Sequence, residues 1–374
     1  MPKKRPILQR AIALVLEYLE SRAPVFTRLL RYHSKIIHPT NIAGVEIFSR
    51  NTRWHEPKYK ESFVKLALAD DVAFREEFAP EIIPISILAT KDYEIHGHIK
   101  APIIASSGLA LSYIPLARLS LTDSYPLPFF RTRNISGTII FIPNIENYFH
   151  LMVDYLLPPI CAIMREPHRY GHITFVMQRH FPMVELFGQL LNDLGISTSI
   201  HPIGKFDRLK GGVLLFGGSE PRDSGAAFAY PDEMRAIGNL ADKYLSASKP
   251  PSRVFVTRSK AQRRRITNEI ELRDVLERYG FKTVELRFGN PLEQIALFRN
   301  AEIIMSVHGA SLTNLIWAKT ARVIELFPSN LRPKHYLNIA AQMGLEYQPI
   351  IGSEGDNRED FIIDIEEIER ALSR

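Results

Sequence analysis

A histidine and an aspartate, His150 and Asp154, stand four residues apart behind an apolar stretch at 138–142. The stretch predicts a buried strand, and the residues from about Tyr148 to Met164 predict a helix. Side chains four residues apart share one face of a helix, so one environment holds both groups. We expect Asp154 to act as a general base toward a hydroxyl group, and His150 to orient it or to bind a substrate. Such pairs are common on helices, so the chemistry depends on what the fold brings near.

Basic residues follow a second apolar strand pattern, at 253–257. Arg258 stands directly at the predicted strand end, and Arg264 lies in the middle of three arginines at 263–265. Guanidinium groups bind phosphate in a bidentate manner, so we expect Arg258 and one or two of the three to face an anionic ligand. Asn268, with a glutamate three residues later, predicts a capping box that orders this loop at the start of a helix.

A histidine and three small residues follow a third strand pattern. Gly309 allows a tight turn, and Ala310 and Ser311 let a diphosphate approach the start of the next helix, whose partial positive charge attracts it. His308 stands at the same turn and is expected to donate a hydrogen bond to the phosphate or to a sugar. A core histidine bonded to the backbone is the alternative interpretation.

An acidic residue, Glu325, interrupts a fourth apolar strand pattern, at 322–327. At the carboxyl end of such a strand, a carboxylate accepts hydrogen bonds from the ribose hydroxyls of a nucleotide. We therefore expect Glu325 to bind a ribose, with an ion pair inside the protein as the alternative.

Strand and helix patterns alternate along residues 138–327 and indicate the elements that position these side chains. Residues 36–135 contain many prolines and short apolar runs, which indicate short strands and loops. Strands separated by helices predict parallel, doubly wound sheets, whose ligands bind beyond the carboxyl ends of the strands. The predicted strands are 138–142, 173–177, 213–216, 253–257, 282–286, 302–307 and 322–327, and the predicted helices are 148–164, one ending near 195, 231–248, 269–279, 292–299 and one from 310.

The net charge of +6 resides in residues 1–35, which hold eight Lys or Arg against two Glu. Apolar residues recur there at helical spacing, from Leu8 to Leu19, so this segment predicts a basic amphipathic helix. Such a helix suits an anionic membrane surface or the protein's own core. Nucleic acid is not an expected partner, because one basic end without a recognisable binding motif is weak support for it.

The compartment is predicted from cysteine usage and from apolar runs. The chain of 374 residues has one cysteine, Cys161, in an apolar run, which fits a reducing compartment. We find no signal-peptide pattern and no apolar run of about 18 residues, the length that spans a bilayer. The sequence therefore predicts a cytoplasmic protein, peripheral on the inner membrane if its basic helix binds lipid.

Taken together, these motifs resemble those of glycosyltransferase family 61, over roughly residues 138–350. The resemblance implies an inverting transfer of a sugar within a GT-B architecture of two facing Rossmann-like domains. The residues that carry it are Thr-Arg-Ser at 257–259, Arg-Arg-Ile-Thr-Asn-Glu at 264–269, Val-His-Gly-Ala-Ser-Leu-Thr-Asn at 307–314, Val-Ile-Glu-Leu-Phe-Pro at 323–328, and the upstream Asn147, His150 and Asp154.

The resemblance assigns roles to domains and residues. The break at 249–252 and the basic N-terminus divide the chain into segments 1–35, 36–248 and 249–374. The resemblance implies that the α/β domain at 36–248 faces the acceptor and that the domain at 249–374, with its C-terminal helix, binds the nucleotide sugar. A UDP-sugar is the expected donor, with no bound cofactor or metal, and the expected acceptor is a glycan or glycolipid of a bacterial capsule or lipopolysaccharide. Asp154 matches the upstream acid, with Asn147 and His150 beside it, and the donor-binding segments match Arg258, Arg264, Asn268, His308 to Ala310, and Glu325.

Two other functions remain open at this stage. One is a catalytically silent protein that keeps the fold and uses its basic N-terminus to recruit a partner or a membrane. The other is a His-x-x-x-Asp acyltransferase, in which His150 is the general base and Asp154 is structural. The acyltransferase leaves the segments around Arg258 and His308 without a purpose, so we rank it last.

Overall fold

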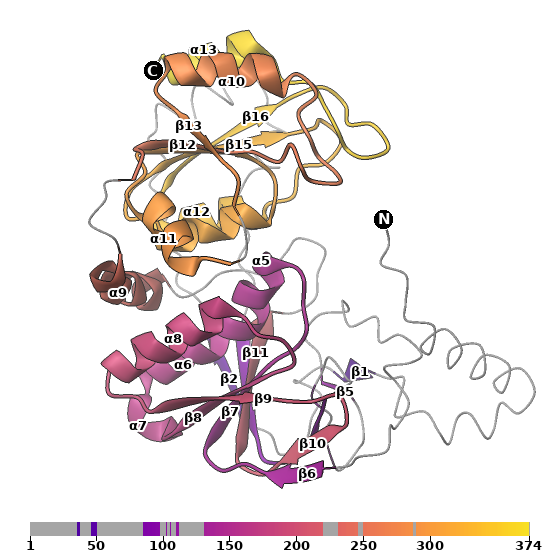
Figure 1. Cartoon of the computed structure of the whole chain (residues 1–374), viewed down its shortest axis with the longest axis vertical. Coiled ribbons are helices and arrows are strands. Elements are labelled where there is room, and N and C mark those ends of the chain that lie inside the picture. Colours follow the sequence, from indigo (N-terminus) through magenta and orange to yellow (C-terminus); the bar gives the residue numbers. More distant parts are fainter. Residues whose placement is uncertain are drawn as a thin grey trace, which may run out of the picture.

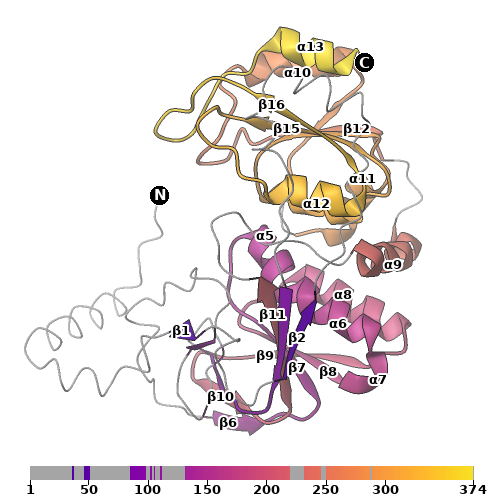
Figure 2. The ribbon, with the colours of Figure 1, turned by 180° about the vertical axis from the view of Figure 1, so that it is seen from behind.

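The computed structural model describes residues 36–37, 46–50, 85–97, 102, 105, 110–111, 131–219, 231–245, 250–286 and 289–373. Two α/β units lie one above the other, with helix α9 (Pro231–Ala241) beside their junction (Figures 1 and 2). The first unit contains a six-stranded sheet, and the second unit, residues 250–373, a five-stranded sheet. The predicted basic helix at 1–35 lies outside the described residues.

The first sheet is mixed rather than wholly parallel, which corrects the prediction. Its four consecutive strands β11, β7, β8 and β9 are parallel, but β3 is antiparallel to β11, and β2 to β3. Parallel pairing is imposed on strands joined by helical crossovers, and the sequence of 36–135 shows no such alternation. The order is β2 (Glu46–Arg50), β3 (Ile85–Thr90), β11 (Val213–Ser219), β7 (Thr138–Ile142), β8 (Ile173–Met177) and β9 (Thr198–Pro202).

Smaller elements complete the first unit. The hydrophobic faces of α6 and α8 pack on the sheet and bury Cys161 completely, as predicted for this thiol. Short polar strands such as β10 were not predicted, because they carry too few apolar residues to give a pattern. These elements are α6 (Leu157–Arg165), α7 (Pro167–Tyr170), α8 (Pro182–Asp193), the sheet β4 (Ile95–His96), β10 (Asp207–Lys210) and β6 (Arg131–Asn134), and the pair β1 (Ile36–Ile37) and β5 (Ala110–Leu111).

The predicted helix at 148–164 exists but changes its winding. It begins as α5 (Tyr148–His150), continues as a π-helix, η3 (Leu151–Leu156), and ends as α6. Pro158 and Pro159 lack the N–H groups that would bond four residues back in an α-helix, so the preceding turn widens. The N–H of Leu157 accordingly donates to the carbonyl five residues back, that of Met152. Single π-turns of this kind are frequent at functional sites.

The second unit contains a parallel sheet, as predicted, in the order β13-β12-β14-β15-β16. The predicted helix from Ala310 is a 3-10 helix, and the α12–β16 unit was not predicted. The strands are β12 (Arg253–Val256), β13 (Lys282–Val284), β14 (Ile303–Val307), β15 (Arg322–Phe327) and β16 (Glu346–Ile351), and the helices are α10 (Glu269–Arg278), α11 (Pro291–Arg299), η5 (Ala310–Trp317), α12 (His335–Met343) and α13 (Ile365–Leu372). The short helix η4 (Asp242–Tyr244) precedes this unit and continues α9.

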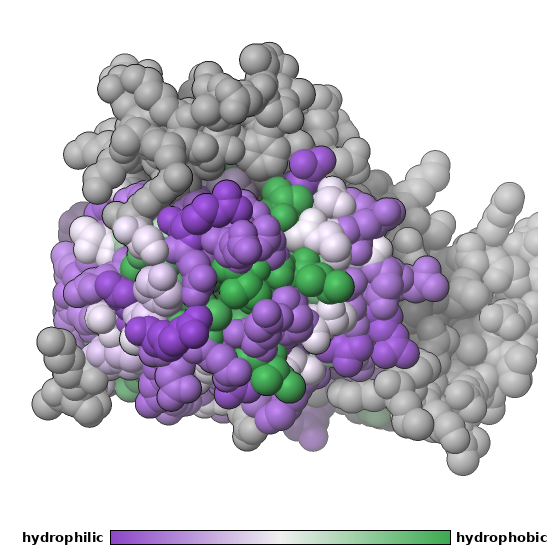
Figure 3. Space-filling model, turned by 90° about the horizontal axis from the view of Figure 1, so that it is seen from above, coloured by the Kyte–Doolittle hydropathy of each residue, from purple (hydrophilic) through white to green (hydrophobic). Residues whose placement is uncertain are grey.

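Helices cover both faces of the second sheet. α10 and α13 bury Leu272, Leu276 and Ile368 against one face, and α11, η5 and α12 pack on the other (Figure 1). Seen from above in Figure 3, the outer surface at α10 and α13 is hydrophilic around a small apolar area. Ile270 of α10 is 80% exposed there, so this face is not where the chain buries its functional groups.

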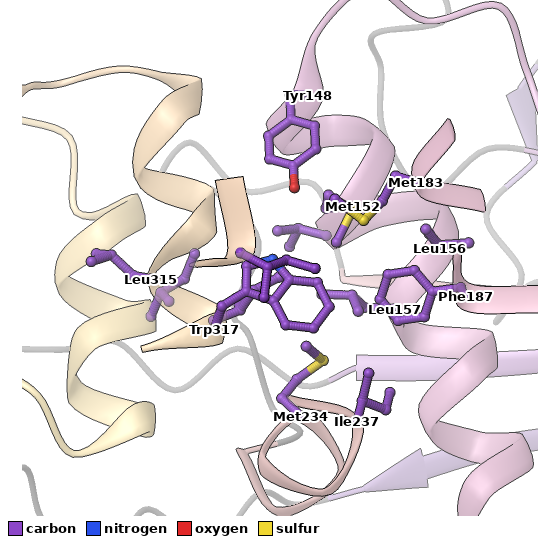
Figure 4. Packing of buried hydrophobic residues seen from close by; sticks show 14 of the residues in the cluster. Tyr148, Met152, Leu156, Leu157, Met183, Phe187, Met234, Ile237, Leu315 and Trp317 are labelled. Atoms are coloured by element: carbon purple, nitrogen blue, oxygen red, sulfur yellow. The ribbon is translucent and has the colours of Figure 1, made fainter. Parts of the chain in front are cut away.

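The two units share one hydrophobic cluster (Figure 4). Trp317, at the end of η5, is fully buried, and its ring lies 5.7 Å from that of Phe187 on α8. Met234 and Ile237 of α9 belong to the same cluster. A hydrogen bond of 2.9 Å from the hydroxyl of Tyr148 to Oδ1 of Asn314 adds a polar link. The domain boundary near residue 249 stays a prediction, because this cluster is continuous across it.

Candidate active site

The carboxyl ends of β12 and β14 mark the point at which the second sheet reverses its strand order. From β12 the chain runs outward to β13 and then crosses back to β14, on the other side of β12. Ligands of open α/β sheets bind outside the strand ends at such a reversal. Val256 is paired with Ser306, so Arg258 and His308 each follow this pair by two residues. The structure thus brings these two predicted residues together at the expected edge.

Arg258 lies across Gly309. A Cβ atom added at Gly309 would stand 2.9 Å from Cζ of Arg258 and even closer to Nη1. The chain bends at Gly309 as predicted, but its φ of 174° is extended backbone that any residue adopts, so the bend itself does not require glycine. A side chain here would displace the guanidinium group of Arg258 from its position. The close approach that we expected of a diphosphate is made by Arg258.

Arg264 is the one member of the 263–265 cluster that turns toward the strand ends. Its Nη1 donates to the carbonyl of His308 at 3.3 Å, whereas Arg263 pairs with Glu359 and Arg265 with Asp360. The φ of Arg264 is 59°, a left-handed conformation that costs a residue with a side chain about 1–3 kcal/mol. Such strain is typical of functional sites, where the surrounding structure holds it in place.

Positive charge exceeds negative charge at this edge. Glu359 Oε2 lies 3.4 Å from Nε of Arg264, but within the described ranges no carboxylate forms an ion pair with Arg258. Burial, and then the charge of Arg264, lower the pKa of Arg258 below its usual value. Two guanidinium groups that repel each other in a partly buried setting favour an anionic ligand with more than one charge.

His308 is held by the acid that we expected to bind ribose. Its Nδ1 lies 2.6 Å from Oε1 of Glu325, and the hydroxyl of Tyr347 donates to Oε2 of Glu325, also at 2.6 Å. Glu325 has no exposed surface, which corrects the prediction of a direct ribose contact: both carboxylate oxygens are engaged by protein groups. Burial raises the pKa of Glu325 well above its ordinary range, against the hydrogen bond from Tyr347.

Of three other predicted residues, Asn268 differs from expectation, and Ala310 and Ser311 do not. Asn268 starts α10 without capping it, so the predicted capping box with Glu271 is wrong. Its side-chain amide bonds instead to both the carbonyl and the N–H of Ile363, at 2.9 and 3.1 Å, and therefore ties α10 to the C-terminal segment rather than to a ligand. Ala310 and Ser311 open η5 beside Gly309 and are half-buried, so a ligand at the strand ends still reaches them.

His150 and Asp154 form a second histidine–acid pair, in the first unit. Nδ1 of His150 lies 2.6 Å from Oδ2 of Asp154. The Asp154 side chain is 3% exposed and that of His150 is 25% exposed. Burial raises the pKa of Asp154, against the hydrogen bond and the charge of His150. The geometry thus favours His150 as the group that meets a substrate and Asp154 as the group that orients it, the reverse of our expectation.

Asn147 positions the start of this helix. Its Oδ1 accepts from the N–H groups of Phe149 at 2.9 Å and of His150 at 3.5 Å, which makes it the N-cap of α5. Asn147 is exposed, so its contact with a ligand stays a prediction. The cap fixes the direction in which His150 leaves the helix.

Aromatic rings connect the two histidine–acid pairs across the junction of the units. Phe149 contacts His150 edge-on with centroids 5.4 Å apart, and stacks on His335 at 5.2 Å. His335 in turn lies 5.6 Å from His308, and Tyr336 lies 4.9 Å from His308. The pairs therefore belong to one site, and sequence reasoning missed the residues that connect them.

The missed residues are Phe149, His335, Tyr336, Tyr347 and Glu359. His335 and Tyr336 open α12, and Tyr347 lies on β16, so none of them stands at the end of a predicted strand. For His335, Tyr336 and Tyr347, the polar groups inside the 335–351 stretch are a signal that could have pointed to them. Within the described residues, no cluster of three His, Cys, Asp or Glu side chains is arranged to hold a metal ion.

Comparison with known proteins supports one class of enzyme for this fold and site, a glycosyltransferase. Residues 148–324, just under half of the chain, match the family described as Glycosyltransferase 61. The matched segment begins at the helix of His150 and ends in the strand that carries Glu325. It therefore contains both histidines, Asp154 and the arginine loop.

The chain is also similar to animal proteins named protein O-linked-mannose beta-1,4-N-acetylglucosaminyltransferase 2. It is 35% identical to the Xenopus tropicalis protein over 108 residues, which are 26% of this chain and 19% of that protein. The Bos taurus protein is 35% identical over 123 residues, 31% of this chain and 20% of that protein. The Homo sapiens protein is 38% identical over 82 residues, 21% of this chain and 14% of that protein. The chain thus spans about a fifth of these relatives.

Proposed function

We propose that the protein is an inverting glycosyltransferase that moves a sugar from a nucleotide-sugar donor, a UDP-sugar, to a hydroxyl group of a glycan acceptor. The observation that carries this proposal is the meeting of Arg258, Arg264 and His308 at the sheet reversal, with His150 connected to them through ring contacts. Two facing domains of the GT-B type, with the donor on the second, are the arrangement that this site suits.

The chemistry needs one displacement. His150, oriented by Asp154, takes the proton of the acceptor hydroxyl as its oxygen attacks the anomeric carbon, and the bond to the diphosphate breaks on the opposite face. Arg258, Arg264 and the start of η5 stabilise the charge that develops on the departing diphosphate. Such preorganised cations act without reorganisation when the bond breaks, so the leaving group needs no other Lewis acid in this scheme.

The acceptor is proposed from the sequence motifs, and the cellular location from the charge of the N-terminal segment. The resemblance of the motifs favours a glycan or glycolipid of a bacterial capsule or lipopolysaccharide, made on the cytoplasmic side of the inner membrane. The excess of six positive charges in residues 1–35 supports attachment to an anionic membrane surface. Among the helices of the described segments, none combines the length and the apolar character needed to cross a bilayer.

Thermal unfolding in the presence of nucleotides tests the proposal directly. Saturation at about 100 times the dissociation constant stabilises a protein by about 2.7 kcal/mol, so UDP should raise the Tm where GDP and CMP do not. The shift should disappear in Arg258→Ala and His308→Ala. Arg278→Ala is the matched control, since this exposed arginine pairs with Glu369 on the outer surface. A folded sample that responds to no nucleotide would instead favour the catalytically silent binding protein.

The histidine–acid geometry also suits an acyltransferase, as the second candidate. A partly exposed histidine backed by a buried carboxylate is the arrangement of a general base that activates a hydroxyl group. This function does not use the arginine pair at the strand ends. Acetyl transfer from coenzyme A that is lost in His150→Ala and kept in Arg258→Ala would identify it.

A further inference from the structure

The hydrogen bond between His308 and Glu325 can be made in two directions by neutral imidazole. With two protons on the pair, a protonated carboxyl group donates to Nδ1 and Nε2 of His308 carries an N–H; with one proton, Nδ1–H donates to the carboxylate and Nε2 has a lone pair. The third form, an imidazolium beside a carboxylate, also carries Nε2–H but places two charges in the site. Only the N–H can donate to a phosphate oxygen, so the proton's position decides what His308 offers a ligand.

Burial of the pair is nearly complete, and this disfavours the charged carboxylate. Glu325 has no exposed surface and His308 is 4% exposed. A buried ionised carboxylate requires strong compensation, and Glu325 receives one neutral donor, Tyr347, besides the ring. Burial accordingly raises the pKa of Glu325 well above its ordinary value, outweighing the effects of Tyr347 and Arg264.

The groups around His308 disfavour a charged imidazolium. Burial, then the charges of Arg264 and Arg258, lower the pKa of His308 well below its ordinary value, and Glu359 opposes them weakly. The ring of His308 packs against that of Phe327, with centroids 5.6 Å apart, and the rings of Tyr336 and His335 also lie next to it. The pair therefore stays neutral overall with its proton on the acid.

The remaining ring nitrogen is the one that solvent reaches. Among the described residues, Nε2 of His308 has no hydrogen-bond partner in the protein, and it is not one of the side-chain nitrogens that are sealed from solvent. Arg264 bonds to the carbonyl of the same residue, and Arg258 covers the following glycine. An anion bound by the two arginines therefore comes next to this ring edge.

We propose that Glu325 is a positioning residue that holds a proton at neutral pH, donates it in the hydrogen bond to Nδ1 of His308, and so fixes Nε2–H of His308 as a donor to the diphosphate. This inference rests on the proposed function, because the diphosphate is that of the donor. Loss of one proton to solvent at high pH turns the bond round: the acid's proton passes to Nδ1, the proton of Nε2 leaves, and Nδ1–H then donates to the carboxylate. Nε2 meets the anion with a lone pair, and diphosphate binding weakens.

The tautomer of His308 is observable without any ligand. In the full-length protein with 15N-labelled histidine rings, long-range 15N–1H correlations distinguish a proton on Nε2 from one on Nδ1, and His308→Gln identifies the signal. The proposal expects Nε2–H with an unprotonated Nδ1 at pH 7. A proton on Nδ1 alone at that pH overturns it.

Binding as a function of pH tests the consequence. The amide of Glu325→Gln donates to Nδ1 as a protonated glutamate does, so this variant should bind UDP and pyrophosphate within about threefold of the wild type at pH 7. Its affinity should stay constant toward pH 9, where that of the wild type falls by about tenfold. Glu325→Ala should bind weakly at every pH, and the exposed Glu354→Gln, in the neighbouring loop, should follow the wild type.

Two outcomes overturn the proposal: Glu325→Gln binding as weakly as His308→Ala, or Glu325→Gln keeping the pH dependence of the wild type. Because the Gln variant preserves shape, these readings do not depend on whether Glu325→Ala folds. If the wild type binds neither UDP nor pyrophosphate at any pH, the proposed function fails, and the histidine spectrum still decides the protonation of Glu325.

Discussion

The hydrogen bonds of the two histidine–acid pairs have the same length, but the two histidines differ in their exposure to solvent. In both, Nδ1 lies 2.6 Å from a carboxylate oxygen, yet the His150 side chain is 25% exposed and the His308 side chain only 5%. His150 ends α5, just before the π-helix, and is partly exposed, whereas His308 lies under two arginines and between aromatic rings. The comparison teaches that a contact of one length can be placed where the ring is accessible, as our proposal requires of a proton acceptor, or where it is not, as it requires of a fixed hydrogen-bond donor.

The largest effect should come from removing the accessible base. His150→Ala should lower kcat by about 10²–10⁴, the usual contribution of a general base, while the affinity for UDP changes little. Steady-state kinetics and nucleotide titration measure the two quantities separately. His308→Ala should show the opposite division, with weakened UDP binding. If both variants lose binding and keep kcat, the pairs do not differ in the way described.

Arg258 should account for most of the affinity on the His308 side. Arg258→Ala removes a charge-assisted contact to the diphosphate, and we expect UDP binding to weaken by about 1.5–3 kcal/mol. Calorimetric titration gives this value, and Arg258→Lys should recover only part of it because lysine lacks the planar fork. Full recovery by lysine would indicate a simple charge effect instead of bidentate binding.

The pairs should also differ in how the stability of the protein depends on pH. The pKa of Glu325 is raised well above 4.5 in the folded state, so above pH 4.5 the folded glutamate binds more protons than the unfolded one. The free energy of unfolding therefore falls as pH rises, by up to about 1.4 kcal/mol per pH unit until Glu325 ionises. Denaturant unfolding of the wild type and Glu325→Gln should diverge in this way. The free energy of unfolding of Asp154→Asn should diverge from that of the wild type in the same direction, but over a narrower pH range. A divergence equal to or larger than that of Glu325→Gln would mean that the environment of Asp154 raises the carboxyl pKa at least as much as that of Glu325.

The smallest effect concerns the polar contact that connects the two units near the first pair. Tyr148→Phe removes the hydroxyl that donates to Asn314, which should cost about 1 kcal/mol of stability. Urea unfolding measures this, with Tyr279→Phe, at a largely exposed hydroxyl contact with Ser373, as the control. An equal loss of stability in both variants would show that the contact across the junction contributes no more than an exposed one.

Much of the second unit could be predicted from the sequence, because its strands are short apolar runs that end in polar residues. Arg258 and His308 were placed correctly by this rule alone, since parallel strands end at the same edge of a sheet. The same rule placed Glu325 at a strand end, but it did not predict the direction in which the side chain points. Whether a strand-end carboxylate meets a ligand or a neighbour depends on Tyr347, which lies on a strand that gave no clear pattern.

The rest depended on contacts between distant segments, which no local pattern records. The sequence around Asn268 predicts a helix cap. In the structure, its side-chain amide instead donates to the carbonyl of Ile363, 95 residues later, and accepts from the N–H of the same residue. The π-turn under Asp154 follows from Pro158 and Pro159, yet the sequence interpretation ran one helix through them. The reversal of roles between His150 and Asp154 depends on burial, and the burial of Asp154 is fixed only when η3 packs on β7 and β11 of the sheet.

The shared cluster around Trp317 has a consequence for cooperativity. Since Phe187, Met234 and Trp317 are buried in one continuous core, neither unit can unfold without exposing apolar surface of the other. The described units should therefore melt as one thermodynamic species, with calorimetric and van't Hoff enthalpies in agreement. A nucleotide bound to the second unit then also protects the first, so hydrogen exchange in β7 and β8 should slow when only the donor site is filled.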